Sequence, residues 1–347
     1  MKKFLALFSA VLIIFTAFMG SGCKNKDYLE FNNNYVSSAT AIAPGYTETL
    51  TYKVEYVEDY NSSLKNVVSK DLLTTTLSGS YVSVLEVINH LPDGISTDIE
   101  TANLQILQLK TTLTLTGSYN DKPVNDKVVT NAYFLNEGQS FAPIYTRSDR
   151  AQTYVAVNGN EILTQKQFYI YETKYNKENY TVNKFAFEKE EDFVVGIEKG
   201  KHMTGSPETY NKKKKYGFRQ VIDNEQLLFI IRNMNIAEEG SINLKVVTPV
   251  YGAPHEIKIN NKNVSTKQVT INGITEEIPV DNLTFGANSI KNSGTAHYVT
   301  VQKKSDDMIT KYSALPVEYA AALIESAMSK VIGSLKYTLT SVNVTNA

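Results

Sequence analysis

The sequence predicts a mainly β protein of the α+β class, built from consecutive antiparallel strands with few helices. Apolar and polar residues alternate over many segments, as they do in strands with one buried and one solvated face. The composition agrees with such strands, because tyrosine, which is enriched in strands, occurs 22 times. Strand-like and helix-like segments do not alternate along the chain, which argues against an α/β substrate-binding protein.

The predicted strands follow one another from about residue 46. TLTYKVEYVEDY and TTTLSGSYVSVLEVI alternate, and residues 104–119 predict a long strand that bends. Hairpins are predicted through DKVVTNAYFL, TYVAVNGNEIL and KQFYIYETKY. The stretch FYIYETKY is more aromatic than a plain strand requires. We interpret it as a strand of the core and its rim, with a ligand-facing role for Tyr169 and Tyr171 as the alternative.

One helix is predicted in VIDNEQLLFIIRNMN. Asp223 is a suitable N-cap, and Gln226 stands where a capping box places its glutamine. The apolar residues that follow recur at helical spacing and predict a stripe that packs on the concave face of a sheet, with a partner-binding helix as the alternative. The stripe consists of Leu227, Leu228, Ile230, Ile231 and Met234.

Strands resume with SINLKVVTPVY and HEIKINN. TKQVTINGITEEIPV predicts a hairpin that turns at Asn272 and Gly273, because Asn-Gly favours the two-residue turn whose twist matches the strands. TAHYVTVQKK, MITKYSALPVEY and GSLKYTLTSV predict the closing strands. Between the last two, AAALIESAMSKVI predicts a second, short helix.

The N-terminal residues 1–22 have the pattern of a signal peptide. Two lysines follow Met1, and the apolar run FLALFSAVLIIFTAFM ends at the small residues GSG before Cys23. This arrangement resembles the lipobox of bacterial lipoproteins, in which the cysteine is diacylated after cleavage. The resemblance implies lipid attachment at Cys23 and a membrane as partner. A secretory signal with an incidental cysteine and a transmembrane anchor are the alternatives.

The signal divides the chain into three parts. Residues 1–22 are the predicted signal peptide, residues 23–45 a polar, lipidated tether, and residues 46–345 an antiparallel β-rich domain. Several acyl chains on one cysteine suffice for stable anchoring, whereas one chain does not. We therefore expect the protein at the cell membrane or envelope, on the extracytoplasmic face.

Three segments of the body resemble, in this order, an uncharacterised family of exported bacterial proteins: QSFAPIYTRSDR, VIDNEQLLFIIRNMNI, and TKYSALPVEY followed by GSLKYTLTSV. That family is thought to form a strongly curved antiparallel sheet, like the lipoprotein-carrier proteins of the cell envelope. The resemblance implies a large curved antiparallel sheet or half-barrel with one or two helices packed on its concave face. A groove in such a sheet suits acyl chains or apolar peptide segments. The candidate groove-lining residues are Leu227, Leu228, Ile231, Tyr169 and Tyr171.

No motif in the chain indicates a reaction. The sequence lacks the HExxH, cysteine-pair, Gly-x-Ser-x-Gly and phosphate-loop patterns, so we predict no catalytic residue, no metal and no cofactor. The four histidines lie outside metal-motif spacing, and we interpret them as turn or surface residues. Lys and Arg total 35 against 36 Asp and Glu, which argues against a nucleic-acid partner.

A run of four lysines concentrates positive charge in one short stretch. Lys212, Lys213, Lys214 and Lys215 stand in YNKKKKYGFR, which we interpret as an exposed loop. Contact with anionic lipid headgroups or wall polymers is the functional alternative.

These patterns lead to one expected function and one alternative. We expect a membrane-anchored, non-catalytic lipoprotein that binds an apolar ligand, such as a lipid or a lipidated segment, in the groove of a curved sheet. The alternative is a structural or interaction protein that docks to cell-wall or envelope partners. An enzyme is the least supported class, since only the location favours it.

The lipid anchor is testable in cells. The wild-type chain should incorporate a labelled fatty acid, and Cys23→Ala should abolish the label because the acceptor thiol is lost. Gel fluorography of both proteins measures this, and equal label in the two would refute lipidation at Cys23.

Overall fold

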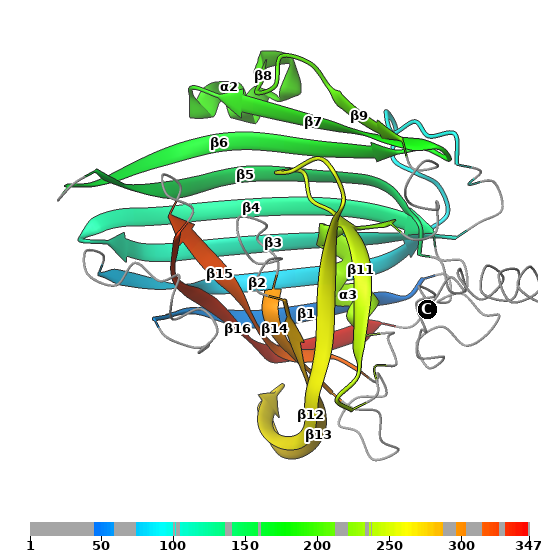
Figure 1. Cartoon of the computed structure of the whole chain (residues 1–347), viewed down its shortest axis with the longest axis vertical. Coiled ribbons are helices and arrows are strands. Elements are labelled where there is room, and N and C mark those ends of the chain that lie inside the picture. The colour runs from blue at the N-terminus through cyan, green and yellow to red at the C-terminus, as the bar shows by residue number, and fades with distance from the viewer. Residues whose placement is uncertain are drawn as a thin grey trace, which may run out of the picture.

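One large, open, curved sheet makes up almost all of the described fold (Figure 1). It contains 16 strands, and neighbouring strands pair antiparallel except for the parallel pair β10 and β11. The fold class predicted from the sequence is therefore confirmed. The computed structural model describes residues 45–58, 74–99, 101, 105–135, 141–158, 161–211, 221–232, 236, 238–286, 296–302, 314–325 and 330–345.

Strands that follow one another in the chain lie side by side in two runs, and the first and last strands, β1 and β16, pair in the middle of the sheet. The order runs from β10 through β16 to β1 and then on through β8, while β9 pairs with β7. The strands are β1 Thr47–Val57, β2 Thr75–Ile88, β3 Ile106–Tyr119, β4 Lys122–Leu135, β5 Pro143–Asn158, β6 Glu161–Tyr175, β7 Asn179–Phe187, β8 Lys201–His202, β9 Glu208–Asn211, β10 Val221–Asp223, β11 Ser241–Val247, β12 His255–Ile271, β13 Ile274–Phe285, β14 Ala296–Gln302, β15 Pro316–Glu325 and β16 Lys330–Thr345.

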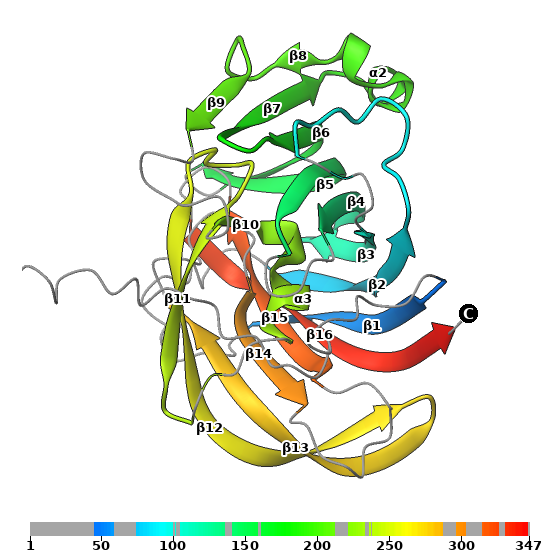
Figure 2. The ribbon, with the colours of Figure 1, turned by 90° about the vertical axis from the view of Figure 1, so that its right-hand side faces the viewer.

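The pairing of β1 with β16 joins the N-terminal and C-terminal halves into one surface. The register runs from Thr47 opposite Thr345 to Val57 opposite Ser334. In the view of Figure 2 the sheet curves around β10 and the helix α3, Leu227–Ile231, so that α3 lies within the curve. The largest core cluster combines α3 with residues of both halves.

The Asn-Gly hairpin is confirmed. Asn272 and Gly273 have φ values of 53° and 79°, as a two-residue turn with both central residues left-handed requires. Ile271 pairs with Ile274 on either side. The Asn272 side chain also binds β16, because its amide donates to the Val342 carbonyl at 2.8 Å. The turn therefore fastens the end of the hairpin to a neighbouring part of the sheet.

The capping box at Asp223 is confirmed as well. The Asp223 carboxylate accepts from the Glu225 amide, and the Gln226 side chain accepts from the Asp223 amide, both at 2.9 Å. A 3₁₀ turn, η4 Asn224–Gln226, leads from the cap into α3. The helix is shorter than the predicted stripe, and Met234 lies outside the described residues.

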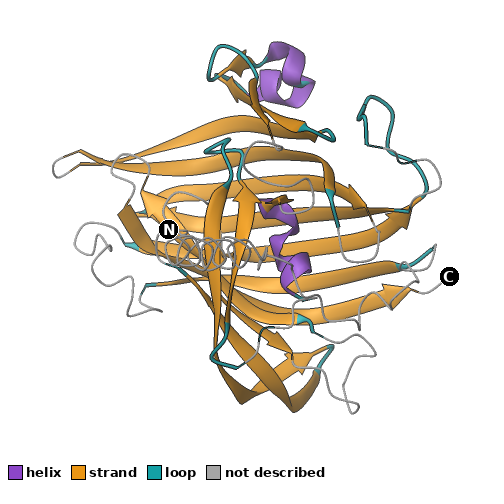
Figure 3. Ribbon diagram, turned by 45° about the vertical axis from the view of Figure 1, so that its right-hand side comes forward, coloured by secondary structure: helices purple, strands orange, loops and turns teal. Residues whose placement is uncertain are grey.

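The prediction of a second, short helix in AAALIESAMSKVI is wrong. Residues 320–325 of the alanine-rich segment belong to β15, which pairs with β14 on one side and β16 on the other, and residues 330–332 begin β16. Residues 326–329 lie outside the described residues. Alanine favours helices by only a fraction of a kilocalorie per residue, so pairing on both sides overrides it. The other helix, α2 Glu190–Val195, stands apart from α3 in Figure 3. Its Phe193 packs against Phe168 and Phe187, on the face of the sheet opposite α3.

A buried ion pair ties the C-terminal end of α3 to the central strand β1. The Arg232 guanidinium donates to both carboxylate oxygens of Glu48, at 2.7 and 2.9 Å. The two side chains are only 4% and 1% exposed. A bidentate pair of this kind fixes direction as well as distance. The end of α3 is therefore held over one strand.

This pair is expected to matter far more than an exposed one on the same strand. Glu48→Gln should lower the free energy of unfolding by about 3 to 5 kcal/mol, because Arg232 stays buried without its carboxylate. Glu55, whose side chain is 49% exposed beside Lys53, provides the matched control. Glu55→Gln should cost at most about 1 kcal/mol. Urea unfolding measures both.

If Glu48→Gln does not fold, a double variant with Glu48→Leu and Arg232→Met provides a second test of the pair. Removing both charges together should recover most of the loss, since no uncompensated charge remains. Equal, small losses for Glu48→Gln and Glu55→Gln would contradict a structural role for the pair.

Candidate functional site

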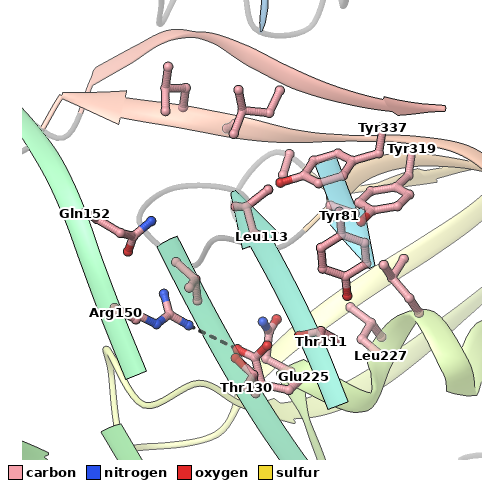
Figure 4. Close-up of a pocket in the computed structure, with 18 residues that line it drawn as sticks. Tyr81, Thr111, Leu113, Thr130, Arg150, Gln152, Glu225, Leu227, Tyr319 and Tyr337 are labelled. Atoms are coloured by element: carbon pink, nitrogen blue, oxygen red, sulfur yellow. Dashed lines mark hydrogen bonds and ion pairs between the residues drawn. The ribbon is translucent and has the colours of Figure 1, made fainter. Parts of the chain in front are cut away.

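A cavity of about 220 Å³ lies on the concave face, beside the turn that leads into α3 (Figure 4). Strands β2 to β5 form one side of it, and β14 to β16 form the other. These two groups of strands come from opposite ends of the chain, so the cavity depends on the pairing of β1 with β16. Its walls differ in chemistry, with tyrosines on one side and polar side chains on the other (Figure 4).

Tyrosines from three strands build the aromatic wall. The rings of Tyr319 and Tyr337 stack at 4.2 Å between centroids, and Tyr81 meets them edge-on at 6.2 and 5.6 Å. Tyr52 extends the cluster behind Tyr81 at 5.8 Å. Burial raises the pKa of the Tyr81, Tyr319 and Tyr337 hydroxyls well above the ordinary value of 10. The wall is therefore neutral at any physiological pH.

The polar wall centres on Arg150 of β5 and Glu225 of η4. Arg150 Nη2 donates to Glu225 Oε1 at 3.1 Å, with the side chains 20% and 16% exposed. Arg150 Nε donates to Ser148 Oγ at 2.9 Å, and the guanidinium lies 5.3 Å from the centre of the Tyr171 ring. These contacts hold Arg150 in one orientation. Gln152 of β5 lines the cavity beside it.

Two of the candidate groove-lining residues, Leu227 and Leu228, line the cavity. Leu228 is half-buried, whereas the other α3 side chains are buried. Ile231 belongs to the core cluster and is not among the lining residues. Tyr169 and Tyr171 lie on the concave face of β6, stacked at 5.9 Å, and also fall outside the lining. Tyr171 is connected to the site by its contact with Arg150.

The other candidate residues are not placed by the structure. Cys23 and the lysines Lys212, Lys213, Lys214 and Lys215 lie outside the described residues, as does most of the predicted tether.

Sequence reasoning missed the residues that give the cavity its character: Tyr81, Arg150, Glu225, Tyr319 and Tyr337. They occupy four separate strands and the turn before α3. Alternation places each strand residue on a face, but only strand order brings those faces together. Glu225 had one usable signal, since it lies two residues after the predicted N-cap Asp223.

Asp223 fixes the position of Glu225. Its side chain is 1% exposed, accepts from the Tyr175 hydroxyl at 2.6 Å and also accepts from the Glu225 amide. Burial, reinforced by the nearby Glu225 charge, raises the pKa of the Asp223 carboxyl from 3.8 to about 6. Through Asp223, Tyr175 of β6 thus anchors the turn that carries Glu225.

The interpretation of the histidines as turn or surface residues is wrong for His297. This side chain of β14 is fully buried, and burial lowers its pKa to about 3. His90 and His202 are exposed, and His255 is half-buried. Within the residues that the structure describes, no three His, Cys, Asp or Glu side chains group as metal ligands would.

A larger depression of about 1180 Å³ lies under α2, on the opposite face of the sheet. Lys122, Lys127 and Lys166 line it together with Val194 and Val195 of α2. The two valines are 76% and 56% exposed. The depression is thus a solvated groove, and the concave cavity is the more enclosed candidate for a small ligand.

Comparison with known proteins returned no relative: no family model, no curated protein and no solved structure matches the chain. In the part of the chain that the structure describes, no helix combines the length and the apolar character needed to cross a membrane.

The Asp223 carboxyl predicts a pH-dependent stability. The native state binds its proton more tightly than the unfolded chain, so the contribution of this group is fully present below pH 3.8 and is lost as pH rises through about 6. The loss should total about 3 kcal/mol. Asp223→Asn keeps a good N-cap and removes the titration.

Unfolding free energies of the two proteins should be measured from pH 4 to pH 7. Their difference should shift in favour of Asp223→Asn as pH rises. His297 titrates in both proteins and cancels in the difference. A difference independent of pH would contradict a raised pKa for Asp223.

Proposed function

We propose that this protein is a membrane-anchored, extracytoplasmic lipoprotein that carries out no catalysis and binds an apolar ligand in the concave face of its sheet. The observation that carries the proposal is the 220 Å³ cavity between α3 and the tyrosine wall. The anchor rests on the N-terminal sequence and Cys23.

The cavity supports binding because it combines enclosure with mixed chemistry. Small-molecule sites are concave, mostly apolar, and carry a few placed polar groups. Here Leu227 and Leu228 of α3 face a wall of tyrosines, and Arg150 and Glu225 stand at the polar side. An amphipathic ligand would match both sides at once.

The size of the cavity limits what enters it. An engineered apolar cavity of about 150 Å³ accepts benzene, so 220 Å³ accommodates a somewhat larger group. The buried part of the ligand would therefore be a ring or a short chain, with the remainder of a long molecule outside. This narrows the class from whole lipids to small amphiphiles or the end of one chain.

A docking role is the second candidate, and the groove under α2 favours it. Val194 and Val195 are neighbouring, exposed apolar residues at its edge. Exposed apolar groups that adjoin one another mark contact surfaces more often than isolated ones do. In that case the ligand cavity would be empty in the protein isolated from its cells.

Mass spectrometry of an organic extract of the purified protein separates the two roles. The wild type should release a small amphiphile in stoichiometric amount, while covalently attached acyl chains stay with the protein. Ala321 lines the cavity, so Ala321→Phe should fill it and abolish the released ligand. Ile274→Phe adds an aromatic ring at an exposed position and is the control.

An empty wild-type protein would overturn the proposal. The same would follow if Ala321→Phe folded normally and released as much ligand as Ile274→Phe.

A further inference from the structure

We infer that the cavity selects an uncharged, hydroxyl-bearing amphiphile over a fatty-acid anion or an alkylammonium cation. The inference rests on the proposed function, because it names the ligand class of the same cavity. It follows from how the charges, the neutral polar groups and the apolar side chains around the cavity are arranged.

The charges at the cavity are balanced and already paired. Among the lining residues that the structure describes, Arg150 and Glu225 are the charged ones, and they form an ion pair at 3.1 Å. Each side chain is about four-fifths buried. Separating such a pair leaves a desolvated charge on each side, which is costly.

Neither partner is free to turn toward a ligand. Arg150 is also bound to Ser148 Oγ, which itself shares a hydrogen bond of 2.9 Å with Thr130 Oγ1. The backbone of Glu225 is held by the Asp223 cap. A ligand carboxylate at this wall would face Glu225, and a ligand ammonium would face Arg150. No spare counter-charge exists in the described lining for either ion.

The remaining polar lining groups are hydroxyls and amides. Thr111, Thr130 and Gln152 lie on the polar wall, and the Tyr81 hydroxyl from the neighbouring strand is hydrogen-bonded to Thr111 (Figure 4). Hydroxyl and amide groups can both donate and accept hydrogen bonds, as an alcohol does. An alcohol group can therefore bind at this wall without displacing the ion pair.

The apolar lining accounts for the other half of the ligand. Leu113 and Val128 line one side of the cavity from β3 and β4, and Leu323 and Leu335 line the other side from β15 and β16. Leu228 of α3 adds a further apolar contact. Scaled from the cavity that accepts benzene, the volume admits a chain of about eight carbons. Octyl compounds with different head groups are therefore the matched probes.

Calorimetric titration of the mature chain with 1-octanol, octanoate and octylamine at pH 7.5 tests the inference. The three probes share one chain and differ in charge, since octanoate is an anion and octylamine a cation at this pH. Octanol should bind the wild type, and each ion should bind at least tenfold more weakly.

Variants of the ion pair should redirect this preference. Glu225→Gln releases Arg150, so octanoate should gain at least tenfold relative to octanol. Arg150→Gln leaves Glu225 without its partner, so octylamine should gain instead. The double variant removes both charges and should again prefer octanol. Glu55→Gln, on an exposed pair remote from the cavity lining, should match the wild type.

The outcomes distinguish the inference from the function on which it rests. If none of the probes binds the wild type, the cavity is no site for an octyl chain and the proposed function fails with the inference. If an ion binds as well as octanol, the inference alone is overturned. The inference also fails if folded single variants, checked by circular dichroism, keep the wild-type preference.

Discussion

Two buried carboxyl groups hold the segment from Asp223 to Arg232 inside the curve of the sheet. The cavity lies between this segment and the strands around it. Tyr175 of β6 binds Asp223 at one end, and Glu48 of β1 binds Arg232 at the other. Strands β2 to β5 lie between these two attachments and line the cavity. A five-residue helix is about 7.5 Å long, so it cannot cover these strands completely.

The same segment brings two of its charged side chains into the curve of the sheet as ion pairs. Burying a charge is tolerable only when it is paired, and Arg232 and Glu225 each have a partner across the sheet. Burial favours the neutral form of Asp223 through its raised pKa. Among the described lining residues of the cavity, the charges of Arg150 and Glu225 balance each other, and a balanced site favours a neutral ligand.

Local chemistry made part of this architecture predictable. The Asn272–Gly273 turn and the Asp223 capping box each depend on residues within four positions, so the sequence alone indicates them. Alternation indicated the strands for the same reason. The alanine-rich segment of β15 was misjudged because its neighbours β14 and β16, and not its own propensity, decide its conformation.

The cavity lay beyond such reasoning. Tyr81 and Tyr319 face each other because β1 pairs with β16, a contact between the two ends of the described domain. The spacing of residues along the chain does not predict that β1 and β16 pair. The helix could be predicted as a packing element, and its residues Leu227 and Leu228 line the cavity. Their partners on the far strands could be identified only in three dimensions.

A crystal structure of the mature protein with 1-octanol tests the central claim most directly. The account predicts octanol in the cavity, with its chain against Leu228 and Leu335 and its hydroxyl toward Thr130, while the pair of Arg150 and Glu225 remains intact. Octanol bound only in the groove under α2, with the concave cavity empty or closed, would contradict it.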